Sequence, residues 1–188
     1  PANSKFENTS TGTITVGGSG GNSSGMAKLT DVSFDSNDLV KNNGIINVSG
    51  DKNSGMFLKS NNNDTFTSTN KINITGGTNN AGMRIEADSG TGIQKGVNTG
   101  TIEISGGSNN MGMLSSSTAY SSTGTVKITT VENGTAGGGV TSGTIKISSG
   151  SSNVGLMNND KGIFTNYGTV DVSGGTKNVG FLISSGSQ

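Results

Sequence analysis

Hydrophobic and polar residues alternate in a short stretch that recurs along the chain. In its clearest copy, residues 101–105, Ile102 and Ile104 alternate with Thr101, Glu103 and Ser105, so both isoleucines point to one side of a predicted strand. Similar stretches occupy residues 13–16, 45–48, 71–74, 144–147 and 169–172, with a blurred copy at 125–128. Self-similarity of this length predicts a solenoid.

Two more strands are predicted in each copy. A glycine corner and an Asn-x-Gly step follow the first strand, and the second strand then begins at Gly25, Gly55, Gly82, Gly112, Gly155 and Gly180. A fainter third strand has candidates at residues 32–34, 65–66, 119–120 and 163–164. Helical periodicity is missing from the pattern. We therefore expect an all-β fold, a parallel β-helix of about seven coils with three short strands each.

In a parallel β-helix, equivalent residues of successive coils stack about 4.8 Å apart. This predicts two aliphatic columns and one methionine-rich column. The first column is Ile14, Ile46, Ile72, Ile102, Val126, Ile145 and Val170; the second is Val16, Val48, Ile74, Ile104, Ile128, Ile147 and Val172; the third is Met26, Met56, Met83, Met113, Leu156 and Phe181. The copy at 125–128 lacks a methionine, so we expect the coil to narrow or bend there.

Asparagine recurs two residues before the glycine that opens the second strand. The positions are Asn53, Asn80, Asn110, Asn153 and Asn178. An amide turned inward at a corner can bond to the backbone and to the next coil, which predicts an asparagine ladder. The alternative is that Asn-x-Gly is ordinary turn chemistry without stacking.

Composition decides between a thin folded core and disorder. Only 28% of the 188 residues are hydrophobic, which can indicate a disordered chain. However, the net charge is zero, there is one proline, and the apolar residues recur at fixed positions. A solenoid needs only a few core residues per coil. We expect residues 1–188 to form a single β-helix segment, a fragment of a longer protein.

The candidate chemistry of the chain is sparse. It has no histidine and no cysteine, which removes the usual nucleophile–histidine pairs and zinc sites. The outward residues of the first strand carry mixed single charges, and Glu103 is expected to pair with Lys127. We predict no catalytic site, no cofactor and no metal, and therefore not an enzyme. Balanced charge argues against nucleic acid, and no apolar run is long enough for a membrane helix.

The repeat resembles a known family. The pattern Asn-x-Gly-Thr-Ile/Val-x-Ile/Val-Ser-Gly-Gly-Ser/Thr-x-Asn-x-Gly-Met/Leu/Phe is clearest at residues 98–113 and 166–181. It is similar to the repeats in passenger domains of large fusobacterial autotransporter adhesins. The resemblance implies a right-handed β-helix on a Gram-negative cell surface, with a signal segment and a C-terminal outer-membrane barrel outside this sequence. It also implies adhesion, a role in virulence, and no transferable binding residues.

We therefore expect an extracellular, non-catalytic adhesin segment that attaches to host cells or other bacteria. Its partner would be a host-cell receptor protein or glycan, or a surface molecule of another bacterium. The alternatives are a structural spacer that presents a distal binding head, and a self-association module. The binding residues are unknown. Aromatic or charged residues on inserted loops would favour binding, and most inserts carry only Ser, Thr and Asn; those at residues 31–42, 84–97 and 115–122 are the exceptions.

Overall fold

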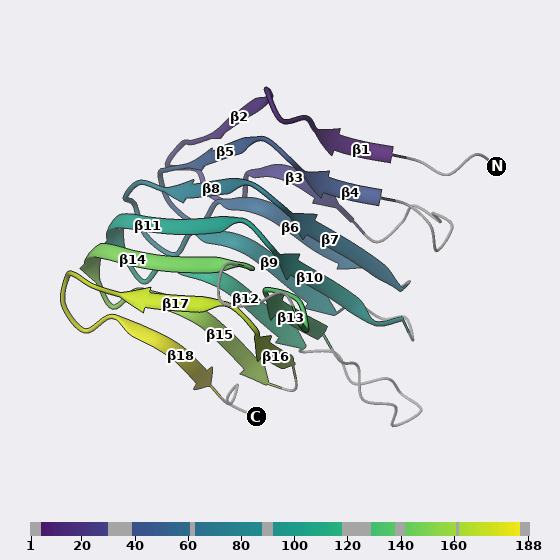
Figure 1. The fold of residues 1–188 in the computed structure, drawn as a ribbon. Coiled ribbons are helices and arrows are strands. Elements are labelled where there is room, and N and C mark those ends of the chain that lie inside the picture. Colours follow the sequence, from purple (N-terminus) through teal and green to yellow (C-terminus); the bar gives the residue numbers. More distant parts are fainter. Residues whose placement is uncertain are drawn as a thin grey trace.

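A computed structural model describes residues 5–29, 39–60, 63–87, 92–117, 129–137, 142–160 and 162–184. These residues form parallel strands in three sheets of six (Figure 1). Sheet A contains β1 (Lys5–Asn8), β4 (Leu39–Asn42), β7 (Asp64–Ser68), β10 (Gln94–Asn98), β13 (Thr129–Asn133) and β16 (Ile163–Asn166). Sheet B contains β2 (Thr13–Val16), β5 (Ile45–Val48), β8 (Lys71–Ile74), β11 (Thr101–Ser108), β14 (Thr144–Ser151) and β17 (Thr169–Val172). Sheet C contains β3 (Ser24–Lys28), β6 (Ser54–Ser60), β9 (Ala81–Ala87), β12 (Met111–Ser117), β15 (Val154–Asp160) and β18 (Val179–Ser184).

The chain visits sheets A, B and C in turn, and each circuit is one coil of a parallel β-helix. Every strand pairs with the equivalent strand of the preceding or following coil, never with its neighbour in sequence. Figure 1 shows the coils stacked in sequence order along one axis, from the N-terminal strands in purple to the C-terminal strands in yellow. The all-β, three-strand architecture predicted from the sequence is confirmed.

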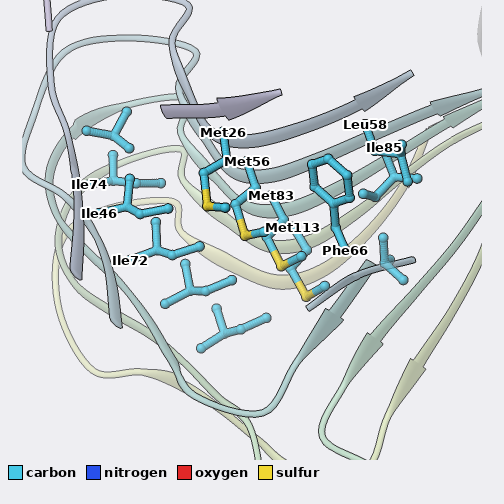
Figure 2. Packing of buried hydrophobic residues seen from close by; sticks show 14 of the residues in the cluster. Met26, Ile46, Met56, Leu58, Phe66, Ile72, Ile74, Met83, Ile85 and Met113 are labelled. Atoms are coloured by element: carbon cyan, nitrogen blue, oxygen red, sulfur yellow. The ribbon is translucent and has the colours of Figure 1, made fainter. Parts of the chain in front are cut away.

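The predicted columns are confirmed wherever the structure describes them. Ile72 of β8 pairs with Ile102 of β11, and Met83 of β9 with Met113 of β12. Figure 2 shows the methionine sulfurs in a row, opposite the isoleucines of sheet B and beside Phe66 of sheet A. The central members of all three columns are fully buried. β-Branched and flexible apolar side chains from all three sheets therefore fill the core in layers, with two from sheet B in each central coil.

The number of coils is a correction to the sequence analysis. The described residues form six coils, not seven, because β11 pairs directly with β14 and Ile102 lies against Ile145. Val126 and Ile128, which were predicted to stack between them, lie outside the described residues. The residues that follow, Thr129–Asn133, form β13 and pair with β10 in sheet A. The alternating pattern at 125–128 resembles that of a sheet B strand, but the six described strands of sheet B do not include it.

The third strands were only partly predicted. The candidates at 65–66 and 163–164 lie in β7 and β16, as expected. The candidates at 32–34 and 119–120, with Phe34 and Tyr120, lie outside the described residues. Their coils instead contribute β4 and β13 to sheet A. The sequence analysis missed β10, in which Gly96 takes the inward position that Phe66 fills one coil earlier.

The glycine at the second position of the first five strands of sheet C is required for space rather than for turn geometry. None of Gly25, Gly55, Gly82, Gly112, Gly155 and Gly180 has a positive φ. A Cβ on Gly112 would lie 2.6 Å from the carbonyl oxygen of Gly155 and 2.8 Å from Cγ2 of Ile145. Sheet C thus approaches the aliphatic column of sheet B too closely for any side chain at this position.

The predicted asparagine ladder lines the corner between sheets B and C, here called the B–C corner. The Oδ1 atom of Asn110 accepts a hydrogen bond from the backbone N–H of Asn80, at 2.8 Å, and Asn153 does the same for Asn110 at 2.9 Å. The Nδ2 group of Asn110 donates to the carbonyl of Gly106 in its own coil and to that of Gly77 one coil earlier. The same pattern includes Asn53 and Asn178.

The backbone explains why this ladder needs a side chain. The residue before each ladder asparagine has a positive φ, for example 57° at Asn79 and 54° at Asn109. The N–H of Asn79 donates to the next coil, whereas the N–H of Met111 donates back to the preceding coil at Asn80. The direction of backbone hydrogen bonding therefore reverses at the corner. At the reversal, the backbone N–H of each ladder asparagine donates to the side-chain amide oxygen of the asparagine one coil later, so this buried N–H keeps a hydrogen-bond acceptor.

A second ladder, which the sequence analysis missed, lines the corner between sheets A and B, here called the A–B corner. Its members are Asn8, Asn42, Ser68, Asn98, Asn133 and Asn166. Side chain bonds to side chain in it: the Nδ2 groups of Asn98 and Asn133 each donate at 2.8 Å to the Oδ1 atom one coil later. Ser68 interrupts the ladder, since Asn98 Oδ1 has no hydrogen-bond partner in the described part of the chain.

Candidate functional site

The outer wall of sheet B carries the charged residues that alternate with the two aliphatic columns. Its central outward column contains Thr15, Asn47, Asn73, Glu103, Lys146 and Asp171. Across the described ranges, no group of three or more Asp and Glu residues could hold a metal ion. The described residues also contain no helix long and apolar enough to cross a membrane.

The ion pair predicted for this wall has a different partner. Glu103 contacts Lys71 in the preceding coil, with 2.9 Å between Oε2 and Nζ, and its register neighbours are Asn73 and Lys146. Lys127, the predicted partner, lies outside the described residues. The hydrogen bond from Lys71 lowers the pKa of the Glu103 carboxyl, and the charge of the same lysine adds to this effect. The pair is half-exposed and links two coils of one wall.

A buried ion pair lies at the corner between sheets C and A. Lys28 at the end of β3 contacts Asp64 at the start of β7, with 2.5 Å between Nζ and Oδ1. The side chains are only 5% and 4% exposed, and the hydroxyl of Ser60 donates to the same carboxylate. Because the charges are paired and inaccessible, we assign them to the packing of the first three coils rather than to a ligand.

The outer face of sheet C carries a pocket of about 200 Å³ over the first three coils. Its polar floor and rim come from Asn22, Ser24, Lys52 and Ser54, at or just after the B–C corner. Phe57 of β6 and Arg84 of β9 complete its wall. We call this feature, defined by these residues, the sheet C pocket.

Side-chain size explains why the pocket lies over the early coils. Ser24 of β3 stacks on Ser54 of β6, and the next residues in the same column are Ala81 and Met111. The small serines leave room beside the corner, whereas Met111 and then Val154 put bulky groups at the equivalent position. The neighbouring outward column changes likewise, from Phe57 and Arg84 to Leu114, Met157 and Leu182.

The electrostatics of the pocket depend on two cations. The Arg84 guanidinium carbon lies 5.2 Å from the centre of the Phe57 ring, a cation–π arrangement. Its Nε and Nη2 groups donate to Glu86 Oε1, with 2.6 Å from Nε. Lys52 has a φ of 56° at the B–C corner, and no ion pair joins it to another described residue. The pocket therefore has one anchored cation and one without a carboxylate partner.

The sequence analysis did not assemble this pocket. The second strands predicted to begin at Gly55 and Gly82 include Phe57 and Arg84, and residues 84–97 were an insert of interest, but nothing in the pattern singled out Lys52, Ser24 or Ser54. Alternation from the buried Met56 would have placed Phe57 outside. Equivalent residues of the three coils that supply the lining lie 30 and then 27 residues apart in sequence, as the hydrogen bonds between these coils show. Only the stacking of coils brings them together.

Comparison with known proteins gives no relative from which a function could be transferred. The chain matches no known protein family, and it is not significantly similar to any curated protein or solved structure.

Proposed function

We propose that this chain is a β-helical segment of a bacterial cell-surface adhesin, non-catalytic and extracellular, which contributes to attachment to host cells or to other bacteria. The observation that carries the proposal is the sheet C pocket. A half-buried aromatic ring, two cations and several hydroxyl or amide groups converge there on the outer face of the stacked coils. Protein pockets that bind small ligands combine apolar surface with a few polar groups at defined positions in this way.

The β-helix suits this role mechanically. Both ladders and all three apolar columns run through successive coils, so load along the axis is shared by many backbone and side-chain bonds. The partner of such a surface would be a host receptor protein, a glycan, or a molecule on another bacterium. The resemblance of the repeat to fusobacterial autotransporter passengers, described above, supports a location on the Gram-negative surface.

A structural spacer is the second candidate. The equivalent outward positions of the later coils, such as Leu114 and Met157, carry apolar side chains, and the coil repeats with little change. In that case this segment would only hold a separate binding head away from the cell. The same fold serves both roles, so adhesion itself has to be measured.

Beads coated with the folded chain provide the test. We expect them to adhere to cultured epithelial cells or to bacterial cells more than albumin-coated beads do, and soluble chain should compete. The matched control is the triple variant Lys52→Asn, Phe57→Ser, Arg84→Gln, which changes only outward or corner residues. If the coated beads adhere no better than albumin-coated beads to any of these cells, the proposal is overturned and the spacer function is supported.

A further inference from the structure

The lining of the sheet C pocket specifies a class of ligand. Resting on the adhesin function proposed above, we infer that this pocket binds a single sugar ring that carries a carboxylate or a sulfate group. The ring would lie on Phe57, its acidic group would contact Lys52 and Arg84, and its hydroxyls would contact Ser24, Ser54 and Asn22.

Size and shape favour one sugar ring. The volume of about 200 Å³ is below the range of roughly 300–1,000 Å³ typical of pockets for drug-sized ligands. Arg84 covers the Phe57 ring from the following coil, while Ala27 is its neighbour in the preceding coil. Ala27 is exposed and has only a methyl side chain, so it cannot cover the other side of the ring. An apolar sugar face can stack there.

The charges favour an acidic sugar over a neutral one. A guanidinium has five N–H donors, and the contacts with Glu86 engage its Nε and Nη2 groups, which leaves donors for a ligand. Glu86 also fixes the plane of the guanidinium beside Phe57. Lys52 adds a second positive charge at the rim, so a carboxylate or sulfate is attracted from two sides.

The remaining polar groups favour a sugar over a bare anion or a peptide. Two serine hydroxyls and one amide line the pocket beside the cations, and these can both donate to and accept from sugar hydroxyls. A bare sulfate ion would leave the aromatic ring unused. An extended peptide would normally pair with a free strand edge, yet β6 and β9 are paired on both sides within sheet C.

Binding of simple sugars to the whole chain tests the inference. The probes are glucuronate, glucose 6-sulfate, glucose, inorganic sulfate and N-acetylglutamate, titrated at low salt and followed by backbone amide shifts in NMR spectra. We expect both acidic sugars to shift the amides of Ser24 and Ser54. Glucose, sulfate and N-acetylglutamate should each bind at least about tenfold more weakly, because each lacks one part of the ligand.

Matched variants separate the pocket from general charge. Lys52→Asn and Arg84→Gln should each weaken the binding of glucuronate about tenfold. Lys177→Asn is the control, because Lys177 has the same corner position and a φ of 54° in the last coil, far from the pocket in sequence and along the axis. Unchanged amide spectra away from the pocket show that each variant is folded. Equal losses in Lys52→Asn and Lys177→Asn would overturn the inference.

The two proposals fail in different ways. If glucose binds as tightly as glucuronate, or inorganic sulfate as tightly as glucose 6-sulfate, the inference of an acidic sugar is wrong. The same holds if N-acetylglutamate binds most tightly, which would indicate an acidic peptide. If coated beads adhere equally with and without Lys52→Asn and are not displaced by glucuronate, the adhesin function stands while the pocket assignment falls. Beads that never adhere overturn the function itself.

Discussion

The two corners that flank sheet B are both lined with asparagine, yet the amides have different roles. At the B–C corner the amide oxygen accepts a backbone N–H, as Asn110 does for Asn80. At the A–B corner the backbone N–H groups donate to backbone carbonyls, as Tyr167 does to Asn133, and the amides bond to one another. The ladder at the B–C corner therefore replaces a missing backbone hydrogen bond. The ladder at the A–B corner adds side-chain hydrogen bonds to backbone groups that already have partners.

This difference predicts unequal costs for equivalent substitutions. A buried donor that loses its acceptor costs the full desolvation of that group, whereas a lost bond between two side chains costs less when each retains other partners. The B–C corner should therefore be the more sensitive one. The five predictions below use urea unfolding of the 188-residue chain unless stated.

The largest effect is expected from Asn110→Ala at the B–C corner. The substitution removes the acceptor of the Asn80 N–H and the donor to the Gly106 and Gly77 carbonyls, all in a buried corner. We expect the free energy of unfolding to fall by about 2–4 kcal/mol. A loss below about 1 kcal/mol would show that water replaces the amide and that the corner does not depend on it.

Asn133→Ala at the A–B corner should cost less, about 1–2 kcal/mol. Asn98 loses the Asn133 Oδ1 acceptor but keeps contacts of its Nδ2 group with the carbonyls of Gly100 and Thr144. No backbone N–H loses a partner. The comparison of the two corners is wrong if this variant is as unstable as Asn110→Ala.

Ser68→Asn should stabilise the chain by about 0.5–1 kcal/mol, because it completes the A–B ladder. Asn42 Nδ2 now donates to Ser68 Oγ at 3.2 Å, and Asn98 Oδ1 is buried without a partner. An asparagine between them supplies both an acceptor and a donor. Ser68→Leu, which adds similar bulk without a donor, is the control and should destabilise. Destabilisation by both would mean that the corner lacks space for a larger side chain.

Ser152→Gly tests the backbone of the B–C corner and should stabilise by up to about 0.5 kcal/mol. Ser152 has a φ of 54°, a left-handed conformation that is unfavourable for a residue with a Cβ. Glycine relieves this strain but increases the freedom of the unfolded chain, so the net gain is small. Asn109→Gly is the matched comparison one coil earlier, and it should gain less because asparagine already tolerates this conformation.

The smallest effect concerns pH. The pKa of Glu103 is lowered by the hydrogen bond from Lys71, so the pair contributes stability above the ordinary pKa of 4.5 and loses it as the pH falls through the folded value. Because the pair is partly exposed, Glu103→Gln should cost at most about 0.5 kcal/mol at pH 7 and almost nothing at pH 3. The cost of Asn110→Ala should not change with pH, since an amide does not titrate.

The sequence by itself determined the strands of sheets B and C and the register of the core. Strict alternation at Ile102 and Ile104, followed by a glycine corner and Met113, leaves one arrangement in which all apolar side chains are inside. The ladder at Asn80 and Asn110 could be predicted too, because the spacing to the next glycine is constant. These features depend on local pattern, which the sequence contains in full.

Tertiary structure decided what depends on which coils are neighbours. Val126 and Ile128 have the sheet B pattern, yet Ile145 takes the place beside Ile102. Glu103 is bound to Lys71 because coil stacking, not sequence separation, sets its neighbours. The role of Gly112 was also hidden, since only the approach of Ile145 and the Gly155 carbonyl shows that a Cβ would not fit.

The sheet C pocket is also a feature that only the tertiary structure decided. Individually, an outward Phe57 or Arg84 follows from the alternation of the strand, but the pocket exists only because Ser24 and Ser54 are small where later coils have Met111 and Val154. Its lining comes from three coils joined through chain segments of different length. The stacking of those coils fixes which side chains meet, and therefore which ligand the surface can recognise.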